Sequence, residues 1–117
     1  MSKAFTAEDF YEAGIGFINS QRWADADEVL QKAILLKPNF PMAYNNRGNA
    51  LQQLHRYFDA VLNYKTAIIL DPKSPELYNN LGAALVALDQ YEAGLESYKQ
   101  SVEIKPNFEQ ALTNLGN

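Results

Sequence analysis

The stretch PMAYNNRGNALQQLHRYFDAVLNYKTAIILDPKS, residues 41–74, decides the fold because the chain repeats its pattern. A shift of 34 residues gives PELYNNLGAALVALDQYEAGLESYKQSVEIKPNF at 75–108, and the opposite shift gives AEDFYEAGIGFINSQRWADADEVLQKAILLKPNF at 7–40. A fourth copy, EQALTNLGN, occupies 109–117 and is partial. Self-similarity at a fixed period of this length indicates stacked supersecondary units. We therefore expect one domain over residues 1–117, built from three full repeats and the start of a fourth. Because the fourth copy is partial, we expect the domain to be a fragment of a longer protein.

Each copy has the pattern of two helices. In the first copy, small and apolar residues at helical spacing predict one helix over about 7–20 and a second over about 24–37. Prolines mark the boundaries, because a proline is tolerated in the first turn of a helix and stops a helix that has reached its end. Pro41 and Pro75 stand at predicted helix starts, and Pro38, Pro72 and Pro106 follow predicted helix ends. The sequence thus predicts an all-α chain of six helices in antiparallel pairs and a truncated seventh.

Small residues recur in register along the predicted helices. Glycines occupy the same place in all four copies, at Gly14, Gly48, Gly82 and Gly116. A glycine inside a helix costs about 0.5–1 kcal/mol relative to alanine. We expect close packing against the large residues of the second helices to offset this cost. Those large residues are Leu30, Tyr64 and Tyr98.

This pattern resembles the tetratricopeptide repeat. The residues that carry the resemblance are Phe10, Gly14, Phe17, Ala26, Leu30, Ala33 and Pro38; Tyr44, Gly48, Leu51, Ala60, Tyr64, Ala67 and Pro72; and Tyr78, Leu81, Gly82, Leu85, Tyr98 and Pro106. The resemblance implies a right-handed superhelix of helical hairpins, with the first helix of each hairpin lining a concave groove. One departure is Arg47, which stands where the family usually has leucine. We expect its stem to pack and its guanidinium to reach solvent or pair with an acid.

The composition excludes several classes of function. The net charge of −4 disfavours nucleic acid as a partner, because that affinity depends on clustered lysine and arginine. No apolar run approaches the roughly 20 residues of a membrane span, and the polar, acidic start is unlike a signal peptide. There is no cysteine to form a disulfide or act as a nucleophile. We expect a cytoplasmic protein.

Catalytic and metal-binding constellations are missing from the sequence. His55 is the single histidine, and it falls in a predicted turn rather than beside a pair of acids. Acid–base catalysis and metal binding need converging groups, and no glycine-rich phosphate loop is present. We therefore predict no enzyme activity, no catalytic residue, no metal and no cofactor.

The resemblance assigns a set of residues to the concave groove. They are Tyr11, Ile15, Met42, Asn45, Asn46, Asn49, Gln53, Asn79, Asn80 and Asn114. Three of them, Asn46, Asn80 and Asn114, recur once per repeat, and we call them the asparagine ladder. Because an asparagine side chain both donates and accepts hydrogen bonds, a ladder can bind the main chain of an extended peptide. It is similar to the asparagine ladder in the repeats of O-linked N-acetylglucosamine transferases. The alternative is that these asparagines are family consensus and bind nothing.

A second use of the family is disfavoured. Members that bind chaperones clamp a C-terminal carboxylate with lysine, arginine and asparagine side chains. The corresponding positions here hold Tyr11, Ile15, Asn46, Glu76 and Asn80. The asparagine of the second repeat matches, but the glutamate would repel a carboxylate. The resemblance therefore does not extend to a carboxylate clamp.

Three hypotheses about function follow. The first is a non-catalytic scaffold that binds an extended peptide or a partner helix in the groove. The second is a substrate-recruiting domain of a larger enzyme such as a glycosyltransferase. The third is a module that self-assembles into a homo-oligomer through its open C-terminal repeat.

One further expectation concerns Trp23, Tyr57 and Tyr91, which recur in register and are predicted to pack between helices.

Overall fold

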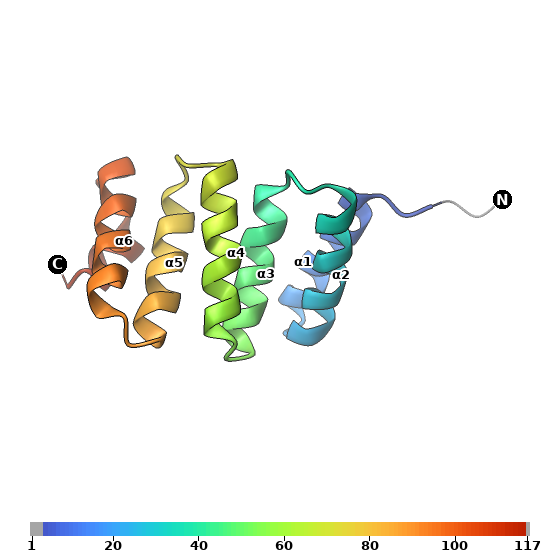
Figure 1. The fold of residues 1–117 in the computed structure, drawn as a ribbon, viewed down its shortest axis with the longest axis horizontal. Helices are drawn as coiled ribbons and strands as arrows, with labels where there is room; N and C mark the ends of the chain where they lie inside the picture. The colour runs from blue at the N-terminus through green and yellow to red at the C-terminus, as the bar shows by residue number, and fades with distance from the viewer. Residues whose placement is uncertain (1–3, 117) are drawn as a thin grey trace.

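The computed structural model describes residues 4–116, and all of the regular structure in that range is helical. The helices stand side by side along the long axis of an elongated molecule (Figure 1). They are α1 (Ala7–Asn19), α2 (Trp23–Leu36), α3 (Pro41–Gln53), α4 (Tyr57–Leu70), α5 (Pro75–Ala87), α6 (Tyr91–Ile104) and α7 (Glu109–Asn114). This all-α arrangement of hairpins confirms the predicted fold class.

The helix boundaries follow the local signals in the sequence. The α1 helix begins with a capping box, in which the Thr6 hydroxyl accepts from the Asp9 backbone N–H and the Asp9 carboxylate accepts from the Thr6 N–H. Pro41 and Pro75 are the first residues of α3 and α5, as predicted. The helices of the first repeat end one residue earlier than expected, and α2 also begins one residue earlier, at Trp23.

A left-handed residue makes the turn inside each hairpin. Gln21, His55 and Asp89 have φ of 60°, 61° and 62°. They are in register, so the same turn geometry recurs in all three hairpins. Residues other than glycine adopt this region infrequently. His55 is therefore a turn residue with an exposed side chain, and its ring stacks on Tyr57 with 5.6 Å between centroids.

The hairpins stack so that their first helices form one side of the molecule. Each hairpin pairs its own two helices, and the contacts of α2 with α3 and of α4 with α5 join successive hairpins. On one side α1 also contacts α3, and α3 contacts α5, whereas the second helices have no contact of comparable extent with one another. The first helices are therefore the more closely spaced set. We call the surface along α1, α3, α5 and α7 the concave groove.

Close contact between the two helices of each hairpin occurs at a glycine. A Cβ atom built on Gly14 would lie 2.6 Å from Leu30 Cδ2, and one on Gly48 would lie 2.6 Å from Tyr64 Cε1. A Cβ atom on Gly82 would lie 2.6 Å from Tyr98 Cε1. The predicted packing is thus confirmed for these three glycines.

The same prediction is wrong for the fourth glycine. Gly116 lies beyond the end of α7 with φ of 85°, and a Cβ there would meet nothing within 4 Å. The α7 helix ends at Asn114, two residues before this glycine. No second helix is present within residues 4–116 for Gly116 to pack against. It serves a turn rather than a helix contact.

The aromatic residues that open the second helices differ in their surroundings. Trp23 packs against the core cluster formed by Ala26, Leu30 and Ala43 together with Ala50, as predicted. Tyr91 is 57% exposed, and its hydroxyl donates to the Asp89 carboxylate at 2.8 Å, so the prediction of packing between helices is wrong for this residue. That hydrogen bond, which the neutral phenol makes, raises the pKa of Tyr91.

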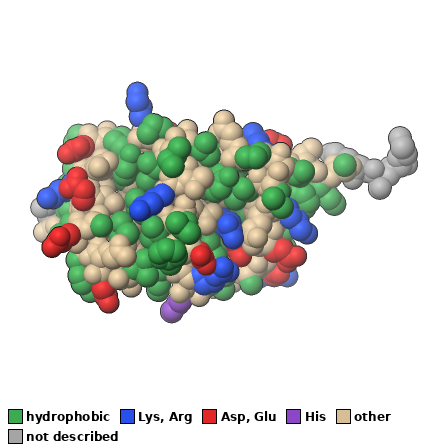
Figure 2. Space-filling model, in the orientation of Figure 1, with side chains coloured by type: hydrophobic (Ala, Val, Ile, Leu, Met, Phe, Trp, Pro, Cys, Tyr) green, Lys and Arg blue, Asp and Glu red, His purple; other side chains and the backbone are tan. Residues whose placement is uncertain are grey.

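The surface carries no basic patch on the face that Figure 2 shows, where side chains of both signs are dispersed among apolar ones. Within residues 4–116, no helix combines the length and the hydrophobicity needed to cross a bilayer.

A pair of glycine substitutions tests the hairpin geometry. We expect Gly48→Ala to lower the free energy of unfolding by about 1–2 kcal/mol, because the new methyl group overpacks against the Tyr64 ring. Gly16 is the matched control, since it lies within α1 with nothing within 4 Å of its Cβ position. Gly16→Ala should raise the free energy of unfolding by about 0.5–1 kcal/mol through helix propensity. Urea unfolding measures both, and stabilisation by Gly48→Ala would contradict the close approach.

Candidate functional site: the concave groove

The asparagine ladder forms hydrogen bonds between successive first helices. Asn80 Nδ2 donates to Asn45 Oδ1 at 2.9 Å, and Asn114 Nδ2 donates to Asn79 Oδ1 at 2.9 Å. In the first interval Asn46 Nδ2 donates to the Tyr11 hydroxyl at 3.2 Å. In each bond, the ladder asparagine donates to a residue of the preceding repeat that lies 35 positions earlier in the chain. The ladder therefore ties α1, α3, α5 and α7 together along the groove.

These bonds divide the predicted groove asparagines into two groups. Asn45 and Asn79 are buried, with 7% and 6% of their surface exposed, and they act as acceptors within the structure. The ladder asparagines are half-buried at 46 and 80 and exposed at 114. Each ladder residue uses one N–H, so its amide oxygen and second N–H have no partner among residues 4–116. The atoms needed to bind a peptide main chain are thus still available on the ladder.

Tyr64 of α4 also contributes a polar group to the groove. The hydroxyl of Tyr64 donates to Asn49 Oδ1 at 2.6 Å and accepts from Gln52 Nε2 at 2.9 Å. Tyr64 is fully buried, and burial raises the pKa of its phenol. The repeat pattern predicts packing between helices for Tyr64 but not this polar role. A comparison of the repeats within the sequence contains the signal. In the first repeat, Leu30 replaces the tyrosine, and Ile15 and Ile18 replace the two amides.

The remaining predicted residues are spread along α1 and α3. Met42 is 49% exposed in the first turn of α3, whereas Gln53 is exposed in its last turn, so the structure does not bring these two together. Ile15 is half-buried on α1. The ring of Tyr11 packs on Phe40 with 4.8 Å between centroids, which orients its hydroxyl toward Asn46. The groove is therefore amide-rich in the middle and more apolar at its N-terminal end.

The charges of the groove are acidic. Glu8, Glu12 and Glu76 are exposed on the first helices. Backbone hydrogen bonding at Glu8, together with its side-chain contact to Lys37 at 3.2 Å, lowers the pKa of the Glu8 carboxyl. Lys37 follows α2, and its contact with Glu8 leaves this cation paired. The groove therefore offers an acidic ligand no concentrated positive charge.

Three family models match the chain. A model described as TPR repeat matches residues 56–89, and two described as tetratricopeptide repeat match residues 75–108 and 29–61. Together they extend over residues 29–108, which is more than half of the chain. The chain belongs to the tetratricopeptide repeat family. No curated protein sequence matches it.

Solved tetratricopeptide repeat structures superpose closely on this chain. The first such domain of Spaghetti (RPAP3), bound to the HSP90 peptide SRMEEVD, has a TM-score of 0.92 at 24% identity, covering 95% of this chain and 88% of that one. The Arabidopsis OM64 domain has a TM-score of 0.92 at 22% identity, covering 94% and 91%. The second domain of human RPAP3, in complex with the HSP70 peptide SGPTIEEVD, has a TM-score of 0.91 at 22% identity, covering 94% and 92%. At these identities the likeness establishes the fold.

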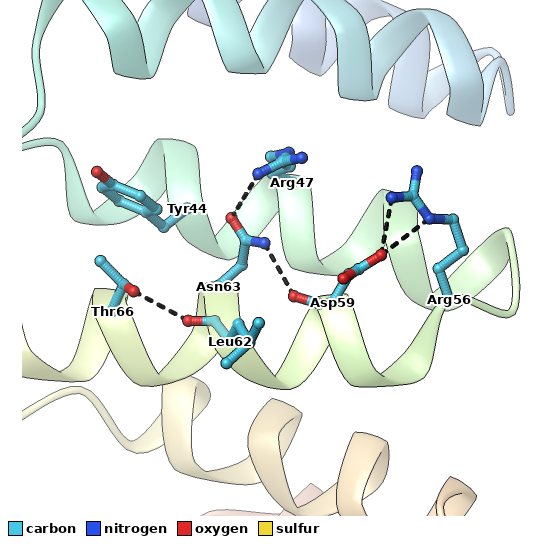
Figure 3. Close-up of a pocket in the computed structure, with 7 residues that line it drawn as sticks. All are labelled: Tyr44, Arg47, Arg56, Asp59, Leu62, Asn63 and Thr66. Carbon is cyan, nitrogen blue, oxygen red and sulfur yellow. Dashed lines mark hydrogen bonds and ion pairs between the residues drawn. The ribbon is translucent and has the colours of Figure 1, made fainter.

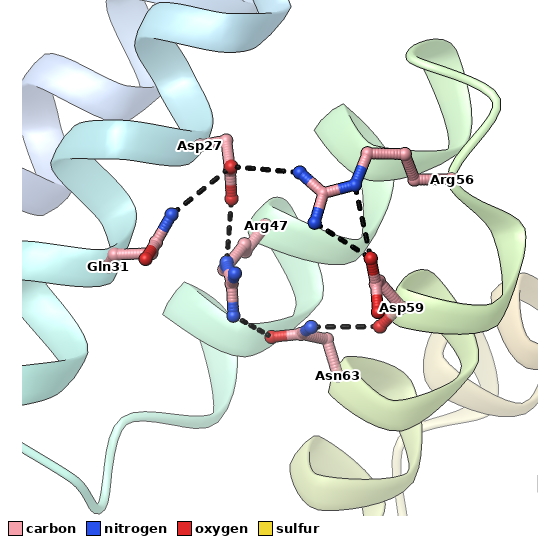
Figure 4. A network of polar contacts seen from close by, with 6 residues as sticks. All are labelled: Asp27, Gln31, Arg47, Arg56, Asp59 and Asn63. Carbon is pink, nitrogen blue, oxygen red and sulfur yellow. Dashed lines mark hydrogen bonds and ion pairs between the residues drawn. The ribbon is translucent and has the colours of Figure 1, made fainter.

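A network of polar contacts joins the first two repeats of this tetratricopeptide domain away from the groove (Figure 4). Arg47 Nε lies 2.6 Å from Asp27 Oδ1, and Arg56 Nη1 lies 3.6 Å from Asp27 Oδ2. The Asp27 side chain is 10% exposed, and it also accepts from Gln31 Nε2 at 3.2 Å. The expectation that Arg47 pairs with an acid is confirmed. One buried carboxylate of α2 thus binds arginines from α3 and from the turn before α4.

A small cavity lies beside this network (Figure 3). Its volume is about 260 Å³, and its lining residues are Tyr44, Arg47, Arg56, Asp59, Leu62, Asn63 and Thr66. The charged groups are paired, because Arg56 Nη2 lies 2.7 Å from Asp59 Oδ2 and Arg47 binds Asp27. Across residues 4–116, no group of three or more His, Cys, Asp or Glu side chains is arranged to hold a metal ion. The cavity therefore has neither an unpaired charge nor a convergent acid–base pair.

Two aspartate substitutions measure what the network contributes. Asp27→Ala leaves the half-buried Arg47 guanidinium without its closest partner, so we expect the free energy of unfolding to fall by about 2–3 kcal/mol. The control is Asp25→Ala, which removes the exposed ion pair of Asp25 with Arg22 and should cost less than about 1 kcal/mol. Urea unfolding measures both variants. Equal losses would show that the network is worth no more than a surface ion pair.

Proposed function

We propose that this chain is a non-catalytic interaction module that holds an extended peptide in the concave groove by hydrogen bonds to its main chain. The observation that carries the proposal is the arrangement of the ladder. Asn46 and Asn80 are fixed by one N–H each and keep a carbonyl oxygen and a second N–H free. A pre-oriented amide loses little entropy when it binds, which favours affinity.

The fold supports peptide binding as the general activity. Two of the similar structures contain peptides, one of HSP90 and one of HSP70. Both peptides end in the acidic sequence EEVD. The groove of this chain carries Glu8, Glu12 and Glu76 and lacks lysine or arginine at the positions compared above. We therefore propose that its ligand is neutral or basic, because acidic groups of the ligand would be repelled.

Peptide selection followed by substitution tests this function. A library of random linear dodecapeptides is displayed against the 117-residue chain, and the affinity of the best binder is measured by calorimetry. We expect the double substitution Asn46→Ala and Asn80→Ala to weaken binding about tenfold or more, because two hydrogen bonds worth about 0.5–1.5 kcal/mol each are lost. The peptide SRMEEVD is the acidic probe, and it should bind at least about tenfold more weakly than the selected peptide.

The matched control is a pair of lysines with the same spacing on the second helices. Lys65 and Lys99 are exposed on α4 and α6, and replacing both by alanine should leave affinity unchanged. Thermal unfolding of each variant separates loss of binding from loss of fold, since Asn80→Ala also removes a donor from the buried Asn45. Equal weakening by both double substitutions would place the ligand elsewhere, and tight binding of SRMEEVD would refute the charge argument.

Self-association is a second candidate, favoured by apolar surface at both ends of the array. At the N-terminal end a hollow of about 610 Å³ is lined by Phe5, Asp9, Phe10, Glu12, Ala13, Phe17 and Val29. At the other end Tyr91 and Leu95 of α6 are 57% and 41% exposed. Two copies joined end to end would bury both surfaces, as α2 and α3 do inside the chain.

Sedimentation velocity at several concentrations tests the second candidate. We expect the average mass to rise with concentration and Leu95→Glu to abolish the rise, because a carboxylate would then be buried against an apolar hollow. Leu62→Glu is the control, since Leu62 is 50% exposed on α4 and lies away from the two ends. A constant monomer mass for the unmodified chain would remove this candidate.

A further inference from the structure

Tyr64 and Tyr98 occupy equivalent places in the second and third hairpins. They are 34 residues apart, on α4 and α6, and each packs its ring edge over the glycine of the preceding helix. The Cβ positions of Gly48 and Gly82 both lie 2.6 Å from the Cε1 atom of the facing tyrosine. Because both rings pack on the equivalent glycine of the first helix, we expect the Tyr98 hydroxyl to lie at the level of the groove where Tyr64 meets Asn49 and Gln52.

The two hydroxyls have different surroundings at that level. Tyr64 donates to Asn49 and accepts from Gln52. The residues in register with those two amides are Ala83 and Val86, which have no polar atom in their side chains. The Tyr98 hydroxyl accordingly has no hydrogen-bond partner among residues 4–116.

The unpartnered hydroxyl is nearly buried but reaches the groove. Tyr98 is 5% exposed, and burial raises the pKa of its phenol. In the described part of the chain, every side-chain nitrogen or oxygen that is fully buried has a partner. The Tyr98 hydroxyl therefore keeps a small contact with solvent. A hydroxyl at the base of a groove, without a protein partner, is a group that a ligand can satisfy.

The neighbouring surface fits one particular kind of ligand group. Ala83 and Val86 supply neither the carbonyl nor the N–H that Asn49 and Gln52 supply in the second repeat. Elsewhere on the first helices, a polar hollow of about 360 Å³ is lined by Asn79 of α5 and by Glu109, Gln110, Thr113 and Asn114 of α7. A peptide unit supplies both an acceptor and a donor, which are the two groups that Tyr64 binds in the second repeat.

We propose that the Tyr98 hydroxyl is a ligand-binding residue of the groove and that it hydrogen-bonds one main-chain peptide unit of the bound peptide over Ala83 and Val86. This inference rests on the proposed function and assigns to it a residue from a second helix. The second and third repeats then differ in role. Tyr64 orients the chain's own amides, whereas Tyr98 takes its partner from the ligand.

Substitution of the two tyrosines separates these roles. Tyr98→Phe should leave the thermal midpoint unchanged, because no hydrogen bond within the chain is lost, and should weaken the selected dodecapeptide about three- to tenfold. Tyr64→Phe is the matched variant, and it should lower the thermal midpoint because Asn49 and Gln52 lose their partner. The double substitution Ala83→Asn and Val86→Gln gives Tyr98 the partners that Tyr64 has. It should weaken the peptide without lowering the thermal midpoint.

A scan of the ligand locates the contact. Each peptide bond of the selected dodecapeptide is replaced in turn by an ester, which removes the N–H and weakens the carbonyl as an acceptor. We expect one ester position to weaken binding to the unmodified chain by about threefold or more and to have no effect on Tyr98→Phe. Such coupling between one bond and one hydroxyl is the signature of a direct hydrogen bond.

The outcomes distinguish this inference from the function on which it rests. If Tyr98→Phe binds the peptide as tightly as the unmodified chain, or if no ester position couples to it, the assignment of Tyr98 is wrong while the effect of Asn46 and Asn80 can still hold. If Tyr98→Phe lowers the thermal midpoint as much as Tyr64→Phe, the hydroxyl is structural and the assignment is again wrong. If the unmodified chain selects no peptide, both the inference and the proposed function fail.

Discussion

The contact between a glycine of each first helix and a large side chain of the second helix determines how close the two helices approach. At Gly14, Gly48 and Gly82 there is no room for a methyl group beside the facing leucine or tyrosine. Since protein interiors are packed at crystal-like density, this distance is transmitted to the neighbouring hairpin through α2–α3 and α4–α5. The spacing of the first helices, and with it the width of the concave groove, follows from three small contacts.

The same contact places a polar group in the groove. Where the large residue is Leu30, the side chain ends in apolar atoms beside Ile18. Where it is a tyrosine, the ring fills the same space and the hydroxyl extends beyond it to the level of Asn49 and Gln52. The large side chain that packs against the glycine thereby also determines whether the base of the groove is polar, as with Tyr64, or apolar, as with Leu30. Packing and recognition are linked at one position of each repeat.

The fold could be predicted from the sequence because it depends on features that recur at a fixed period. Prolines, glycines and apolar spacing recur every 34 residues and specify helix ends and close contacts without knowledge of partners. Gly116 shows the limit of this argument, since it shares the register but lies beyond the end of α7, with nothing within 4 Å of its Cβ position among the described residues. Periodicity predicts a residue's place in the repeat, and the contact also requires the neighbour.

The groove was harder to predict for the same reason. The resemblance to the family assigned the ladder to the groove, but it could not show that Asn80 and Asn114 bind the buried asparagines of the preceding repeat. Nor could it reveal the shared carboxylate of Asp27, whose partners Arg47 and Arg56 have no counterpart of the same type in the third repeat. Pairwise hydrogen bonding depends on which two side chains face each other, and that differs from repeat to repeat.

Departures from the repeat are therefore the places where this chain expresses a function of its own. A residue that is identical in every repeat is explained by the stacking that all repeats share. Tyr98 keeps the tyrosine of the second repeat, but the residues in register with Asn49 and Gln52 are Ala83 and Val86. Among residues 4–116 its hydroxyl therefore has no hydrogen-bond partner. The nearly buried Tyr98 hydroxyl keeps only a small contact with solvent. In the proposed role, a peptide unit supplies the partners that Asn49 and Gln52 supply to Tyr64.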